Sequence, residues 1–227
     1  MHFMVIGLIL LGIVFLPGMW VRHVLAKYAE PEDRYSSTGA QTARELLDRH
    51  GMRSVKVEET SAGDHYDPKN KAIRLTPGNF AGRSLTAITV AAHEFGHALQ
   101  DRDGYKPLRL RGQLVEATQT LEKLGAAIMM ISPIIVALTR APGVGILVFL
   151  GGLLALGTST LVHLATLPTE LDASFNRALP VLEREHVLKA ADHHHAREIL
   201  RAAAFTYVSA SLMSLLNIAR WIAILRR

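Results

Sequence analysis

The segment His93-Glu94-Phe95-Gly96-His97 holds the residues of this chain whose types and spacing are best suited to chemistry. Residues four apart lie one above the other on a helix, so His93 and His97 can both point at one ion. Two imidazoles with a glutamate between them, in the spacing His-Glu-x-x-His, are typical of a zinc site in which the glutamate acts on water. The alternative is a pair of helix histidines that binds no metal. We expect one catalytic Zn²⁺ here, with Glu94 as the catalytic residue.

A catalytic zinc ion also needs a third protein ligand and an open coordination position. The chain has no cysteine, so that ligand must be a histidine or a carboxylate. A longer motif with a third histidine is excluded, because the position six residues after His97 is Asp103. We expect the third ligand to be Glu170, in a helix that opens at Pro168, with Asp172 as the competing ligand. Without a metal, Glu170 would be a carboxylate that stabilises a helix start.

The polar segment between the apolar runs must contain the elements that position these residues. The elements expected there are a helix over 38–50, a strand over 55–58, a hairpin over 65–75 and a helix over 85–100. Ser84 is suited to cap the last of these helices, which carries the His-Glu-x-x-His motif. The expected catalytic core is therefore helical, with a small β-sheet.

Long uncharged runs suggest that this core is attached to a membrane. Hydrophobic residues make up 49% of the 227 residues and charged residues only 20%, which excludes disorder and a large multidomain soluble protein. Four runs predict about four transmembrane helices. A cleaved signal peptide is the alternative for the first run, and a helix lying on the membrane surface is the alternative for the last. The predicted division is an N-terminal transmembrane anchor at 1–21, a cytoplasmic zincin-like domain at 22–123, a transmembrane hairpin at 124–167, cytoplasmic helices at 168–201 and a C-terminal membrane helix at 202–227.

The charge pattern gives the expected orientation of these segments. Basic residues follow the first apolar run and recur over 168–201, so both polar segments are expected in the cytoplasm. The net charge of +5 is not gathered in a stripe, so we expect no nucleic-acid partner. The expected partners are a polypeptide substrate and the lipid bilayer. Nothing in the sequence specifies an oligomeric state.

The chain resembles the membrane-bound neutral zinc metallopeptidases, the YugP-like family, over nearly its whole length. The blocks that carry the resemblance are His65–Pro68, Arg83–Leu85, Ala91–Gln100, Glu170–Ser174, Arg177–Leu179 and Arg201–Ala204 with Tyr207. Together with the apolar runs and the charge pattern, the resemblance predicts a mainly α-helical, multi-pass protein of the bacterial inner membrane, with a zincin-like catalytic core that faces the cytoplasm. It implies a peptidase activity and little about the substrates.

A more distant similarity is to membrane gluzincins of the HtpX and CAAX-protease type, whose third-ligand helix reads Glu-x-x-Ala-Asp. Here the same frame reads Glu170-Leu-Asp-Ala-Ser174, which supports Glu170 as the ligand. Ser174 replaces an acidic residue that in those enzymes supports a ligand histidine. Asp172 or a water could supply that support instead.

The reaction expected from these residues is peptide-bond hydrolysis of membrane-associated or unfolded polypeptides, with Glu94 as general base. Candidates for stabilising the oxyanion are Arg177, His163 and Tyr66. The alternatives are a membrane scaffold or chaperone-like binding protein that keeps a zinc site without robust proteolysis, and a transporter.

Three consecutive histidines, His193–His195, invite a second metal interpretation. Successive side chains on a helix diverge by about 100°, so the three cannot share one ion well. With Asp192 as a helix cap, we expect an exposed turn there.

Overall fold

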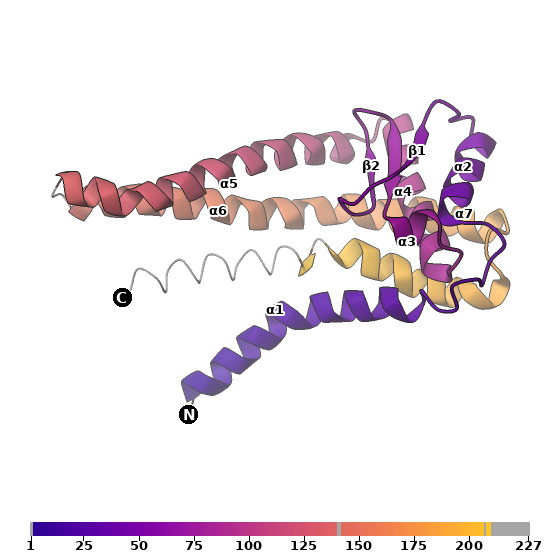
Figure 1. Ribbon diagram of the computed structural model, residues 1–227, viewed down its shortest axis with the longest axis horizontal. Helices are drawn as coiled ribbons and strands as arrows, with labels where there is room; N and C mark the ends of the chain where they lie inside the picture. The colour runs from indigo at the N-terminus through magenta and orange to yellow at the C-terminus, as the bar shows by residue number, and fades with distance from the viewer. Residues whose placement is uncertain (1, 140–141, 207, 210–227) are drawn as a thin grey trace. The chain divides into compact units, whose positions relative to one another are not determined.

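The computed structural model describes residues 2–139, 142–206 and 208–209 (Figure 1). The chain forms two compact units. Unit 1 comprises residues 1–18, 110–167 and 207–227, and unit 2 comprises residues 19–109 and 168–206. The His-Glu-x-x-His motif and Glu170 both belong to unit 2, so the candidate site can be described within that unit.

Unit 2 contains a three-stranded sheet of β1 (Lys56–Glu59), β2 (His65–Asp67) and β3 (Ala72–Leu75), in the order β1-β3-β2. β2 pairs antiparallel with β3, which confirms the predicted hairpin, and β1 pairs parallel with β3. The Asp67 carboxylate accepts the backbone N–H groups of Lys69 and Asn70 and so shapes the hairpin turn. The central strand β3 is the most deeply buried of the three.

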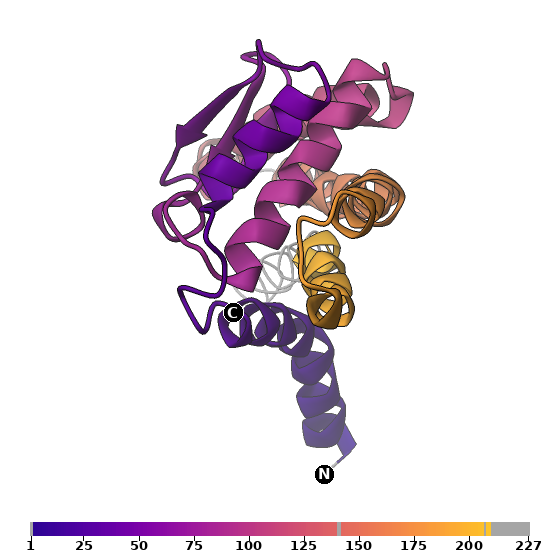
Figure 2. The ribbon, with the colours of Figure 1, turned by 90° about the vertical axis from the view of Figure 1, so that its right-hand side faces the viewer.

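Two helices lie side by side next to this sheet: α2 (Gly39–Arg49) and α4 (Leu85–Arg102) (Figure 2). α2 begins with a capping box, in which Thr38 and Gln41 each satisfy the other's backbone N–H. α4 begins after Ser84, whose hydroxyl accepts the Ala87 N–H at 3.2 Å, as the sequence predicts. A single turn, α3 (Pro77–Phe80), connects the sheet to α4.

α4 runs through the middle of unit 2. Every residue from Leu85 to Gln100 is buried, including the polar residues of the motif. The largest apolar side chains packed in this core come from α2, β3, α4 and the helical residues 179–184 and 193–206; they include Leu46, Leu47, Ile73, Leu75, Ile88, Phe95, Leu182, Ile199 and Leu200. The motif is therefore held by a helix that cannot shift without disturbing the core.

The chain that carries Glu170 is helical on both sides of that residue. α6 extends over Pro142–Leu171 and includes Pro168, so the prediction that a new helix opens at Pro168 is wrong. The next turns form η1 (Asp172–Ala178), a π-helix in which the Leu179 N–H bonds to the Ser174 carbonyl five residues earlier. α7 (Leu179–Arg184) and the short η2 (Ala190–Asp192) follow.

The prediction of about four transmembrane helices is wrong. Across the part of the chain that the structure describes, no helix is both long enough and apolar enough to cross a bilayer. Two of the uncharged runs are parts of longer helices that also contain charged residues or residues packed in the core of unit 2. α1 (His2–Lys27) ends with Val21 and Val24 in the core of unit 2, and α5 (Lys106–Thr139) is rich in charged residues over its first half.

The mainly helical architecture with a small sheet agrees with the prediction. The predicted C-terminal membrane helix at 202–227 lies outside the described residues from 210 onward. In unit 1, α5 and α6 run alongside one another and together line a small apolar cavity at Ile128, Ile131, Ile135 and Gly151.

Candidate metal centre

Three side chains that are far apart in the sequence meet inside unit 2. His93 Nε2 lies 3.3 Å and His97 Nε2 lies 3.2 Å from the same oxygen, Glu170 Oε2. The side chains of His93, His97 and Glu170 are 5%, 4% and 0% exposed. Their three potential ligand atoms lie within 4.8 Å of one another. α4 supplies the two imidazoles and the end of α6 supplies the carboxylate.

The donor set and its spacing fit a zinc ion. Zinc binds imidazole nitrogen and carboxylate oxygen at about 2.0–2.1 Å, and neighbouring ligands of a tetrahedral site are then about 3.3 Å apart. The two nitrogen-to-oxygen distances of 3.3 and 3.2 Å match that spacing. Two histidines and one glutamate leave a fourth position open, as in catalytic rather than structural zinc sites.

The other ring nitrogen of His97 has its own buried partner. Nδ1 lies 2.9 Å from Oε1 of Gln100, three residues further along α4. The Gln100 side-chain NH₂ group donates to the carbonyl oxygen of Thr169 and to Asp172 Oδ2, both at 2.8 Å. Sequence reasoning missed Gln100. The signal that could have found it is its position three residues after His97, which places both on one helix face.

His93 is supported from η1. Its Nδ1 lies 3.0 Å from the hydroxyl of Ser174, and that hydroxyl lies 3.3 Å from the carbonyl oxygen of Leu200. A carbonyl can only accept, so the hydroxyl proton goes to Leu200 and the serine oxygen accepts from His93 Nδ1–H. Ser174 itself therefore contacts His93. The sequence had suggested that Asp172 or a water supports this histidine, in place of the acidic residue that Ser174 replaces.

The described hydrogen bonds of Asp172 do not involve His93 or His97. It accepts from Gln100, from Arg177 Nε at 2.8 Å and from Asn176 at 2.9 Å. Burial raises the pKa of Asp172, but the hydrogen bonds from Gln100, Arg177 and Asn176 outweigh it and hold the pKa below its ordinary value. The carboxylate therefore stays ionised as an acceptor for the amide of Gln100.

The predicted oxyanion stabilisers have other partners. Arg177 donates to Asp172 and, at 2.5 Å, to Asp103. The Tyr66 hydroxyl donates to Asp101 Oδ2 at 2.7 Å, and burial together with this carboxylate raises the pKa of Tyr66. The side chain of His163 lies outside the described residues. Within the described hydrogen bonds, neither Arg177 nor Tyr66 contacts the metal-binding side chains.

Glu94, the predicted catalytic residue, is buried on α4 directly after His93. A carboxylate in that position is next to the metal-binding group but is not one of the three ligand residues. Glu170 thus contacts the two imidazoles, and Glu94 lies next to His93 on α4.

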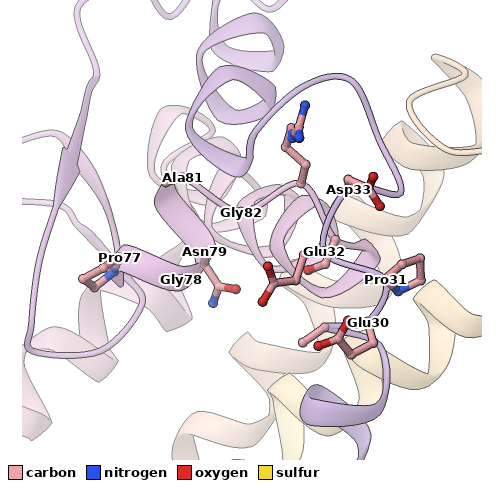
Figure 3. A pocket seen from close by; sticks show the side chains of 12 residues that line it. Glu30, Pro31, Glu32, Asp33, Pro77, Gly78, Asn79, Ala81 and Gly82 are labelled. Carbon is pink, nitrogen blue, oxygen red and sulfur yellow. The ribbon is translucent and has the colours of Figure 1, made fainter.

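A second cavity, of about 830 Å³, lies at the opposite end of α4 from His97 and shares no residue with the metal-binding group. Figure 3 shows the loop Glu30–Asp33 on one side of it and the turn Pro77–Gly82 on the other. Ser84, the cap of α4, forms part of its wall.

The histidines at 193–195 do not form a second metal-binding group with the acidic residues that the structure describes. The predicted exposed turn is instead the start of a helix, in which His194 is exposed and His193 and His195 are half-buried. Asp192, the predicted cap, is buried, and the Arg34 guanidinium and the Tyr35 hydroxyl both bind its carboxylate. The ring of His195 packs on Tyr28, with centroids 5.0 Å apart.

Comparison with known proteins agrees with this geometry. The family described as "Putative neutral zinc metallopeptidase" matches residues 3–226. A protein of Bacillus subtilis (strain 168), "Putative membrane protease YugP", is 33% identical over 226 residues, which cover 99% of this chain and 96% of that relative. No solved structure matches the chain. The chain therefore belongs to the neutral zinc metallopeptidase family, whose metal the buried group of His93, His97 and Glu170 is suited to hold.

Proposed function

We propose that this protein is a zinc-dependent metalloendopeptidase that hydrolyses peptide bonds. The observation that carries the proposal is the meeting of both His Nε2 atoms with one Glu170 oxygen in a buried site. A zinc ion held there supplies Lewis acidity, which polarises a substrate carbonyl and makes water a stronger nucleophile at neutral pH. The protein contributes the ligand geometry and a general base.

Glu94 is the general base in this proposal. It accepts a proton from the attacking water and delivers it to the amine that leaves when the peptide C–N bond breaks. Its position supports the role, because it follows His93 on the same rigid helix and is buried. Burial excludes bulk water and strengthens electrostatic interactions with the reacting groups.

The substrates proposed are membrane-associated or unfolded polypeptides. An extended chain can add to the edge of a sheet through backbone hydrogen bonds, and β2 is an edge strand that also contacts α4. We also propose a location at a membrane, which is supported by the name of the YugP relative and by exposed apolar side chains such as Leu138 and Leu154.

The test compares wild type with Glu94→Gln, both loaded with zinc, on a generic unfolded polypeptide. The variant keeps the three ligands, so it should bind zinc as wild type does. Its cleavage rate should fall by about 10²–10⁴-fold, the usual contribution of a positioned general base. Glu45→Gln, at an exposed position on α2, is the matched control and should cleave normally.

One outcome would overturn the proposal. If zinc-loaded wild type cleaves nothing that Glu94→Gln fails to cleave, the site binds metal without hydrolysing peptides. The scaffold or chaperone-like alternative would then describe the protein better.

A further inference from the structure

Gln100 is a fully buried amide with a polar contact at each end. It is 0% exposed on α4. Oε1 lies 2.9 Å from His97 Nδ1, and Nε2 lies 2.8 Å from both the Thr169 carbonyl oxygen and Asp172 Oδ2. An uncompensated buried amide costs free energy, so a position that satisfies both of its ends at once is strongly determined by its surroundings.

The partners decide which way the amide faces. A carbonyl oxygen and a carboxylate can only accept hydrogen bonds, so the NH₂ group of Gln100 must face Thr169 and Asp172. Its oxygen then faces His97 and can only accept, which requires the proton of that imidazole to be on Nδ1. Nε2 is left with its lone pair directed to the side where Glu170 lies, 3.2 Å away.

Asp172 is itself held in place. Arg177 Nε donates to Asp172 Oδ2 at 2.8 Å, and Arg177 Nη1 donates to Asp103 Oδ2 at 2.5 Å. The guanidinium carbon also lies 5.5 Å from the centroid of the Tyr105 ring. The carboxylate that orients Gln100 is thus anchored to the loop that follows α4.

We propose that Gln100 is a positioning residue for the zinc ligand His97, and that Asp172 acts on the metal only through Gln100. In this arrangement Asp172 and the Thr169 carbonyl orient the amide, and the amide presents the Nε2 lone pair of His97 for coordination. The inference rests on the zinc site that the proposed function uses, but it does not depend on peptide cleavage.

The first test is Gln100→Leu, which keeps most of the side-chain volume and removes the acceptor. Zinc affinity, measured by competition with a chelator and without substrate, should fall about 10–100-fold, as is usual when a partner of a ligand histidine is lost. The visible spectrum of the cobalt-substituted protein should change as well, since it reports the ligand geometry. A loss of overall stability that leaves the ligand geometry intact would not change that spectrum.

Thr86→Val is the matched control. It also removes a buried side-chain hydrogen bond on α4, the 2.8 Å bond from Thr86 to the Leu25 carbonyl, but near the other end of the helix. Zinc affinity and the cobalt spectrum should both match wild type. If the control lowers affinity as much as Gln100→Leu does, the effect is general destabilisation and the proposal fails.

A double-mutant cycle tests the route through Gln100. If Asp172 acts only through the amide, Asp172→Ala should weaken zinc binding in wild type but add nothing in the Gln100→Leu background. Losses that multiply would show that Asp172 acts independently, for example as a ligand, and would overturn that part of the proposal.

Asp172→Asn keeps the inference testable if Gln100→Leu does not fold. It retains an acceptor for the Gln100 amide, so it should weaken zinc binding less than Asp172→Ala does. Equal losses in the two variants would contradict the orienting role. Because every readout is zinc binding, these results stand whether or not Glu94→Gln and wild type differ in cleavage.

Discussion

A Cβ atom placed on Gly96 would lie 2.5 Å from the carbonyl oxygen of Ala173. Gly96 lies within the His-Glu-x-x-His motif on α4, and Ala173 is in η1 between Asp172 and Ser174. The helix that carries His93 and His97 and the π-helix that carries Ser174, the hydrogen-bond partner of His93, are therefore in backbone contact at this point. A glycine is needed here because of the close approach of the two segments.

The first prediction concerns this contact. Gly96→Ala should force α4 and η1 apart and lower the free energy of unfolding by about 1–3 kcal/mol, the usual cost of overpacking. Zinc affinity should fall as well, because Ser174 and Asp172 move with η1. Urea unfolding and chelator competition measure the two effects.

Gly112→Ala is the control, since a Cβ there meets no atom within 4 Å in the interior of α5. It should bind zinc normally and be as stable as wild type or up to about 1 kcal/mol more stable. A Gly96→Ala protein with wild-type stability and zinc affinity would show that the two backbones can separate without consequence.

Local sequence signals predicted much of unit 2. Ser84 before an apolar-patterned segment marked the start of α4, and the turn residues at 67–71 marked the hairpin, because caps and turns depend on a few neighbouring residues. The proximity of His93 and His97 could also be predicted locally, because the two residues lie four apart on one helix. Glu170 was predicted from the chemistry of the missing ligand and from family resemblance, and the structure brings it to the histidines.

Features that depend on tertiary contacts were not predicted. The π-helix η1 and the amide of Gln100 are determined by packing between α4 and the chain after Glu170, which no local pattern records. Asp192 was predicted only as a helix cap; that its carboxylate is buried against Arg34 and Tyr35 was not predictable locally, because these partners lie more than 150 residues away in the sequence. The transmembrane prediction was wrong, because no helix among the described residues is both long enough and apolar enough to cross a bilayer.

The second prediction concerns Ser174. Ser174→Ala leaves His93 Nδ1 without its 3.0 Å acceptor, so the imidazole is less firmly oriented toward the metal. Zinc affinity should fall about 10-fold or more. Ser174→Thr keeps a hydroxyl and should retain more of the affinity if the extra methyl group is accommodated. Equal affinity for wild type and Ser174→Ala, by chelator competition, would contradict the role of the hydroxyl.

The third prediction concerns metal removal. Zinc that binds only the folded state stabilises it by an amount that grows with the free zinc concentration, by about 1.4 kcal/mol for each tenfold increase above the dissociation constant. The Tm of wild type should therefore fall on chelation and rise again on adding zinc. Glu170→Gln loses the anionic ligand and should show a much smaller response. A wild-type Tm that does not change on chelation or on adding zinc would argue against metal binding at this site.

The last prediction concerns the pH dependence of stability at Asp192. The hydrogen bond from Arg34 lowers the pKa of this carboxyl; burial opposes the shift, and Tyr35 adds to it. A carboxyl with a lowered pKa in the folded state contributes stability that is fully present above its unfolded pKa of about 3.9 and is lost as the pH falls through the folded pKa. Asp192→Asn should therefore cost about 1–3 kcal/mol at pH 6 and progressively less below pH ~4.

Urea unfolding of wild type and Asp192→Asn between pH 6 and pH 3 measures this convergence. Asp48→Asn is the control, because Asp48 is an exposed carboxylate that pairs with Arg44 one turn away on α2. Its effect should stay below about 1 kcal/mol throughout. A constant difference between wild type and Asp192→Asn across the pH range would mean that the side chain stabilises the fold by packing and not by its charge. The Arg34–Asp192 pair would then have no part in how unit 2 responds to acid.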